Sequence, residues 1–158
     1  IHMFLAKYDK PNYEENTAGA IMNSNFISIQ TGSDVKKIMK DTTLVMGASE
    51  NVQRYSNMAI KKLLSHNHKV KAFGIRGGEV EGVVIEKLPV HCDDIDTITL
   101  YLNPTNQKPY YDYILSLKPR RVIFNPGTEN SELQTLLKEN NIEFEEACTL
   151  VLLSINQY

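Results

Sequence analysis

Apolar and polar residues follow one another along the chain in blocks that predict strands separated by helices. Short apolar runs predict five strands, over residues 43–46, 69–73, 97–102, 121–124 and 142–146. Between them, apolar residues recur at helical spacing and predict helices over about 55–65, 106–117 and 131–140. Strands alternating with helices are typical of βαβ units. We therefore expect an α/β fold, a Rossmann-like doubly wound, mainly parallel five-stranded sheet with helices on both faces.

Outside these blocks the patterning is weaker. Ser33 is a candidate cap for a short helix, and residues 83–85 fit a small strand inside an irregular segment. Residues 1–32 follow no regular period, and their first three residues resemble a tag scar. We expect an unassigned N-terminal extension over 1–32 and a single Rossmann-like domain over 33–158.

The carboxyl ends of the predicted strands are the first place to look for a site, because ligands of open parallel sheets bind there. The segments that follow the strands are 47–51, 74–76, 103–104, 125–127 and 146–148. Four of these five are rich in Gly, Pro, Asn or Ser. Such residues are common in any turn, but four such ends at one edge of a sheet favour a binding site.

The stretch VMGASENVQRYS joins the first predicted strand to the first helix. It departs from the dinucleotide fingerprint G-x-G-x-x-G, because the three glycine positions hold Gly47, Ser49 and Val52. Gly47 permits a tight turn, Ala48 and Ser49 are small, and the amides at a helix start favour an anion. Arg54 is a candidate phosphate donor, although an isolated arginine is commonly a solvated surface residue. The loop therefore predicts a phosphate site.

The end of the second strand separates classes of nucleotide ligand. An NAD site usually has an acidic residue there to hold the ribose hydroxyls. This chain has Arg76 instead, and no acid before Glu79. An arginine suits a ribose that carries its own phosphate, as in NADP and in CoA. The residues disfavour NAD and leave NADP and CoA both open.

Four motifs together resemble those of a known protein family. They are VMGASEN at 45–51, RYS at 54–56, LNP at 102–104 and FNPG at 124–127, with a cysteine after the last predicted strand. They resemble the small stand-alone CoA-binding domain proteins, which have a Rossmann-like fold related to the CoA-binding domain of the succinyl-CoA synthetase alpha subunit. The resemblance covers about residues 34–158 and implies that CoA is the ligand.

The resemblance also implies a role for each matching segment. The first loop would hold the pyrophosphate, the end of the second strand the adenosine, and the late Asn-Pro segments the pantetheine arm. The cofactor-binding residues predicted in this way are Gly47, Ala48, Ser49, Glu50, Arg54, Ser56, Gly74, Ile75, Arg76, Asn103, Pro104, Asn125, Pro126, Gly127 and Cys148. Many family members have Asn-Pro where this chain has Gly74 and Ile75, so the chain departs from the family pattern at the adenosine.

The sequence offers no arrangement of catalytic or metal-binding residues that spacing supports. Cys92 and Cys148 form no C-x-x-C pair, and the histidines have no ligand spacing with them. Cys148 is predicted on the ligand side, where its thiol could form a mixed disulfide with CoA, although inert cysteines are commoner. We therefore expect a CoA or acyl-CoA binding module rather than an enzyme.

Bulk properties narrow the partners further. The net charge is −2 with no basic cluster, which disfavours nucleic acid, and the apolar runs are too short to span a membrane. Two reduced thiols fit a cytoplasmic protein. Two alternatives stay open: an NADP-binding oxidoreductase with Tyr101 as proton donor, and a non-catalytic interaction domain. In the latter, the apolar residues 150–153 would form the seam of a homodimer or complete the core.

Overall fold

The computed structural model describes residues 39–158. The chain divides after Met39 into two units, and the second unit, Lys40–Tyr158, holds every predicted site residue. The predicted extension over residues 1–32, the domain boundary that follows it and the short helix capped by Ser33 lie outside the described residues.

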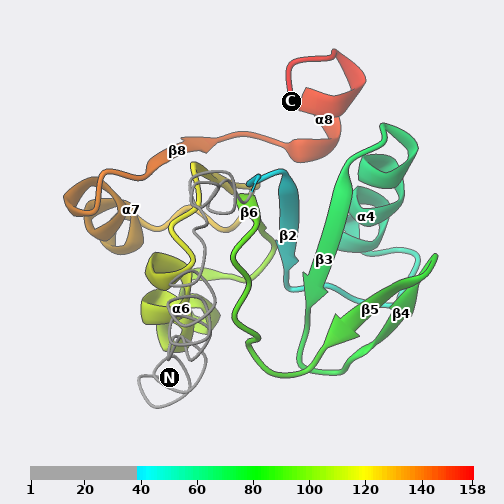
Figure 1. Ribbon diagram of the computed structural model, residues 1–158, viewed down its shortest axis with the longest axis horizontal. Helices are drawn as coiled ribbons and strands as arrows, with labels where there is room; N and C mark the ends of the chain where they lie inside the picture. Colours follow the sequence, from blue (N-terminus) through cyan, green and yellow to red (C-terminus); the bar gives the residue numbers. More distant parts are fainter. Residues whose placement is uncertain (1–38) are drawn as a thin grey trace, which may run out of the picture. The chain divides into compact units, whose positions relative to one another are not determined.

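The second unit is built on a seven-stranded sheet in the order β4-β5-β3-β2-β6-β7-β8 (Figure 1). The strands are β2 (Thr42–Met46), β3 (Lys69–Phe73), β4 (Gly78–Val80), β5 (Val83–Glu86), β6 (Ile95–Leu100), β7 (Arg121–Phe124) and β8 (Glu143–Glu146). All neighbours are parallel except β4 and β5. Numbered along the chain without β4, the parallel strands run 3-2-1-4-5-6, which is the Rossmann order.

The prediction of five strands was wrong, because the sheet has seven. The small strand expected over 83–85 is β5, and it pairs with β3 through Ala72–Ile85 and Phe73–Glu86. β4 was not predicted, because its Gly78 and Glu79 have poor strand propensity. Its pairing with β5 makes it a strand. The strand predicted over 97–102 begins and ends two residues earlier, as β6.

The helices are α4 (Tyr55–Ser65), α5 (Pro104–Gln107), α6 (Tyr111–Ser116), α7 (Ser131–Glu139) and α8 (Thr149–Ser154), with a 3₁₀ turn η1 (Lys108–Tyr110) between α5 and α6. The single helix predicted over 106–117 is therefore wrong. Pro109 lacks an amide hydrogen and interrupts the α-helical hydrogen bonds there. Asn103 moves the start earlier, because its side chain accepts a hydrogen bond from the amide of Asn106 at 2.8 Å.

Helices cover both faces of the sheet, as two neighbouring residues of β3 show. Ala72 packs with residues of α4, whereas the ring of Phe73 meets the ring of Tyr110, just before α6, at 5.0 Å. Successive side chains of a strand point to opposite faces. Hence α4, which lies beside β3 in Figure 1, and α6 are on opposite faces.

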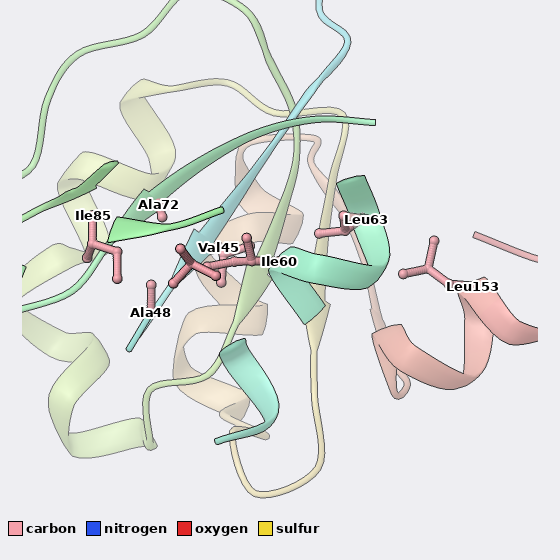
Figure 2. Packing of buried hydrophobic residues seen from close by; sticks show 8 residues of the cluster. Val45, Ala48, Ile60, Leu63, Ala72, Ile85 and Leu153 are labelled. Carbon is pink, nitrogen blue, oxygen red and sulfur yellow. The ribbon is translucent and has the colours of Figure 1, made fainter. Parts of the chain in front are cut away.

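One apolar cluster fixes α4 and α8 on the sheet (Figure 2). Its members come from four strands, from the loop after β2 and from the two helices: Val45, Ala48, Ile60, Leu63, Ala72, Val80, Ile85 and Leu153. Burying one of the larger side chains of this cluster, a valine, leucine or isoleucine, stabilises the fold by about 1.5–3 kcal/mol. Leu153 is buried, so this end of the apolar segment over 150–153 completes the core, while Val151 stays exposed. Among residues 39–158, no helix combines the length and apolar character needed to cross a bilayer.

Candidate functional site

A hollow of about 500 Å³ opens at the carboxyl edge of the parallel strands. It lies at β2, where the strand order reverses, and the loops after β2, β3, β6 and β7 all contribute to it. Doubly wound sheets bind their ligands at this point. The lining residues are Gly47, Ala48, Ser49, Arg54, Tyr55, Ser56, Phe73, Ile75, Arg76, Tyr101, Leu102, Asn103, Asn106, Pro126, Gly127 and Thr128.

The charged side chains that line this hollow, among residues 39–158, are all positive. Arg54 and Arg76 belong to the lining, and none of the described lining residues is an acid, a histidine or a cysteine. Both arginines are exposed, and within the described part of the chain neither takes part in an ion pair. Two unpaired guanidinium groups are therefore available to an anionic ligand.

The loop after β2 is anchored at its first two residues. The amides of Gly47 and Ala48 both donate to the carbonyl oxygen of Phe73, each at 2.9 Å. Gly47 has φ +97°, and a Cβ atom there would lie 2.9 Å from the backbone carbon of Tyr101. Only glycine suits this position, because it accepts positive φ and has no side chain to clash. These two amides are occupied, so neither is available to a ligand.

The start of α4 has backbone amides without hydrogen-bond partners in residues 39–158, in contrast to the first two residues of the loop. Arg54 stands at the helix cap, and no side chain caps this end. Its carbonyl accepts from the amides of Asn57 and Met58, while the amides of Tyr55 and Ser56 have no partner among the described residues. Both of those residues line the hollow. Free amides at the positive end of a helix favour an anion.

The segment after β3 turns sharply beside this loop. The amide of Gly77 donates to the carbonyl of Gly74 at 3.0 Å, which places Ile75 and Arg76 at the tip of the turn. A Cβ atom on Gly74 would lie 2.2 Å from the carbonyl oxygen of Ala48. Gly74 itself is buried and does not line the hollow, whereas Ile75, 73% exposed, and Arg76 do. The glycine predicted as an adenosine contact thus lets the two loops approach.

Three predicted residues of the Asn-Pro segments have structural roles. Asn103 lines the hollow but caps α5, with Pro104 at the first position of that helix and outside the lining. Asn125 is buried beneath the hollow; its side chain donates to Thr99 at 2.7 Å and accepts from the amide of Thr149 at 2.8 Å. Pro126 and Gly127 do belong to the lining.

Two further predicted residues, Glu50 and Cys148, also lie outside the lining. The carboxylate of Glu50 accepts a hydrogen bond from the amide of Glu79 at 2.8 Å. Cys148 is half-buried at the start of α8.

Several lining residues were missed by the sequence reasoning: Tyr55, Phe73, Leu102, Asn106 and Thr128. Tyr55 stands inside the RYS motif, and Leu102 and Thr128 each adjoin an Asn-Pro segment. These three residues could therefore have been predicted from the motifs beside them. Tyr101 was considered only as a proton donor to NADP. Its hydroxyl is buried and has no hydrogen-bond partner among the described residues, and this burial raises its pKa to about 12.

The histidines of the described residues lie elsewhere. His66 and His68 follow α4, and His91 contacts Asp93 at 2.7 Å, so the histidines of the described residues are absent from the lining. Within residues 39–158, no three His, Cys, Asp or Glu side chains gather as metal ligands would. The hollow thus offers amides, hydroxyls and guanidinium groups, which bind anions.

Comparison with known families decides the class of the protein. The family model described as "CoA binding domain" matches residues 41–154. The chain belongs to this CoA-binding family. The family resemblance predicted from the four motifs is therefore confirmed, and a CoA-binding module is supported.

Solved structures show the same fold. A protein described only as uncharacterised is 48% identical, with a TM-score of 0.73; the match covers 75% of this chain and 98% of that one. A conserved hypothetical protein from Pyrococcus furiosus is 23% identical, with a TM-score of 0.60 and coverage of 68% and 92%. A Thermus thermophilus protein is 18% identical, with a TM-score of 0.64 and coverage of 80% and 98%. The last two show the fold alone. No curated protein matches the sequence.

Proposed function

We propose that this protein binds CoA or an acyl-CoA in the hollow at the carboxyl edge of the sheet and does no chemistry on it. The observation that carries the proposal is the charge of the lining: two arginines that no ion pair occupies and, among the described residues, no acidic side chain. CoA is a polyanion with a pyrophosphate and a separate ribose phosphate. The two arginines come from different loops and suit two separate phosphate groups.

Each part of the ligand has a place in the proposed complex. The pyrophosphate is held by the free amides of Tyr55 and Ser56 and by Arg54, where the positive end of α4 faces the hollow. The 3′-phosphate of the ribose lies near Arg76 on the turn after β3. The pantetheine arm runs past Asn103 and Pro126, over the ends of β6 and β7.

Binding without turnover is proposed because the lining offers no group suited to proton transfer or nucleophilic attack. General acids and bases in proteins are most often His, Glu or Asp, and these are absent from the described lining. The hydroxyls of Ser49 and Ser56 have no histidine beside them in that lining. A serine needs such a base to act as a nucleophile.

Isothermal titration calorimetry tests this proposal. The full chain is titrated with CoA, acetyl-CoA, NADP and NAD under identical salt conditions. We expect CoA and acetyl-CoA to bind with a dissociation constant below about 1 mM, equivalent to more than about 4 kcal/mol of binding free energy. We expect NAD to be much weaker. No heat with millimolar CoA would overturn the proposal, and tighter binding of NADP than of CoA would favour the oxidoreductase alternative.

A further inference from the structure

An acidic residue follows directly on the part of the β2–α4 loop that lines the hollow. Glu50 comes immediately after Ser49, yet its carboxylate does not line the hollow. Its Oε2 atom accepts a hydrogen bond from the backbone amide of Glu79 at 2.8 Å, across 29 positions of the chain. The loop after β2 is thus tied by this side chain to the first residues of β4.

Gly78 shows how closely the two segments fit. Its φ is +116°, and a Cβ atom there would lie 2.3 Å from Cδ of Glu50 and 2.6 Å from Oε2. Any side chain at position 78 would push the carboxylate away from the amide of Glu79. The glycine at the start of β4 therefore leaves space for the Glu50 side chain.

Glu79, whose amide donates to Glu50, lies just beyond the turn that contains Arg76. The entry of this turn is held by the amide of Gly74, which donates to the carbonyl of Glu86 at 2.9 Å. The turn is closed by the Gly77–Gly74 hydrogen bond, and its exit reaches Glu79, where Glu50 accepts. Gly77 and Gly78 between them both have positive φ, so this exit is made of the residue type with the most backbone freedom.

We propose that Glu50 is a positioning residue, which holds the Arg76 turn against the phosphate loop and so sets the preference for a ligand with a phosphate on its ribose. The proposal rests on the proposed function, because it assigns the ribose phosphate of CoA to Arg76. Glu50 touches no ligand atom in this scheme. It acts through the amide of Glu79 and the two glycines before it.

Charge and position predict opposite effects, which makes the role testable. A carboxylate near an anionic ligand repels it, so removing the charge alone should strengthen binding or leave it unchanged. Losing the hydrogen bond should weaken the hold on the ribose phosphate. Glu50→Gln keeps an acceptor oxygen at the same reach and removes the charge. Glu50→Asp keeps the charge and shortens the side chain by one methylene, so it cannot reach the same amide.

The experiment measures dissociation constants of CoA and 3′-dephospho-CoA by calorimetry for the wild type, Glu50→Gln and Glu50→Asp. Glu79→Ala serves as the matched control, because it removes an acid from the same hairpin and keeps the amide that Glu50 binds. We expect the wild type to prefer CoA by about tenfold, a free-energy difference of about 1.4 kcal/mol. We expect Glu50→Gln and Glu79→Ala to keep this preference and Glu50→Asp to reduce it below about threefold.

Each outcome decides something. An unchanged preference in Glu50→Asp would overturn the positioning role, and so would an equal loss of both ligands, which would show a general disturbance of the loop. A loss of preference in Glu50→Gln as large as in Glu50→Asp would also overturn the role, because glutamine keeps an acceptor oxygen at the same reach. If the wild type binds neither ligand, the proposed function fails and the positioning role fails with it. If the wild type binds both equally, the CoA site stands and the positioning role is overturned. A thermal melt of each variant verifies that it is folded.

Discussion

The carbonyl oxygen of Ala48 occupies the space where a side chain on Gly74 would begin, 2.2 Å from the position of its Cβ atom. The two residues belong to the loops after β2 and β3, which together form one wall of the hollow. Contact between two backbones without any side chain between them fixes how far apart these loops are. The distance from the start of α4 to Arg76 depends on this contact.

Replacing Gly74 with alanine should therefore damage both stability and binding. The new methyl group meets backbone, which cannot move aside like the end of a flexible side chain. We expect Gly74→Ala to lower the free energy of unfolding by about 3 kcal/mol and to weaken CoA binding in the folded fraction. Urea denaturation measures the first effect and calorimetry the second.

Gly82→Ala is the control for this prediction. Gly82 has φ +88°, unlike Gly74, and a Cβ atom placed there meets no atom of the described residues within 4 Å beyond its chain neighbours. Its cost should be the backbone strain alone, about 1–2 kcal/mol. Equal losses in the two variants would contradict the contact between Gly74 and Ala48 as the cause.

Arg54 and Arg76 should have separable effects on ligand binding. We expect Arg54→Ala to weaken CoA and 3′-dephospho-CoA alike, by about tenfold, because both carry the pyrophosphate. Arg76→Ala should weaken CoA by a similar factor and leave 3′-dephospho-CoA nearly unchanged. Lys138→Ala, which removes a positive charge from α7 outside the hollow, should change neither affinity by more than about twofold. Identical profiles for the two arginine variants would show that they share one phosphate.

Asn125 should matter for folding rather than for the ligand. Its buried amide group joins Thr99 and the carbonyl of Leu100 on β6 to the amide of Thr149 at the start of α8. Alanine at position 125 removes three hydrogen bonds and leaves the buried amide of Thr149 without its acceptor, while the Thr99 hydroxyl keeps its hydrogen bond with the Thr149 hydroxyl. This loss should cost about 3 kcal/mol. Chemical denaturation of the ligand-free protein checks this value. Asn106→Ala, at an exposed position, should stay within about 0.5 kcal/mol of the wild type.

Acid should destabilise the fold partly through Asp96. Burial alone would raise the pKa of its carboxyl, but hydrogen bonds from Arg120, at 2.9 and 3.0 Å, and from Thr97 bring the pKa below its ordinary value. A carboxyl with a lower pKa in the folded state stabilises fully above its unfolded value, about 3.9. That contribution disappears as the pH falls through the folded-state pKa.

The measurement is urea unfolding between about pH 6 and pH 2. The wild type should lose stability below about pH 4 more steeply than Asp96→Asn, whose neutral side chain does not titrate. Asp94 also has a lowered pKa, since hydrogen bonds from Lys71 and Thr42 outweigh its burial. The variant should therefore retain part of the slope. Parallel curves for the two proteins would show that Asp96 carries no part of the acid sensitivity.

Much of the sheet could be predicted from the sequence because its central strands are buried on both faces and show as apolar runs. β2 is buried at all five positions, and α4 begins and ends where its pattern indicates. β4 could not be predicted, because three residues that begin with a glycine become a strand only through pairing with β5. The break at η1 could have been predicted, since Pro109 stands in the printed sequence.

For the site, the location of the residues could be predicted from the sequence, but the role of each residue could not. Loop residues could be placed at the hollow because the ends of parallel strands meet at one edge. Their individual roles could not. Gly74 and Asn125 stand within the predicted segments, but only the folded chain shows that one spaces two loops and the other joins β6 to α8. The motif around Glu50 likewise gave no sign of Glu79, 29 residues away.

The carbonyl oxygen of Phe73, which accepts from both Gly47 and Ala48, has a consequence for the kinetics of recognition. Because these amides are fixed to β3, the start of the loop is already ordered before a ligand arrives. A preorganised loop avoids the entropy loss that a disordered one would suffer on binding. Association should then proceed at the rate of diffusion and docking, without a slow conformational step, and differences in affinity between related ligands should appear mainly in their residence times.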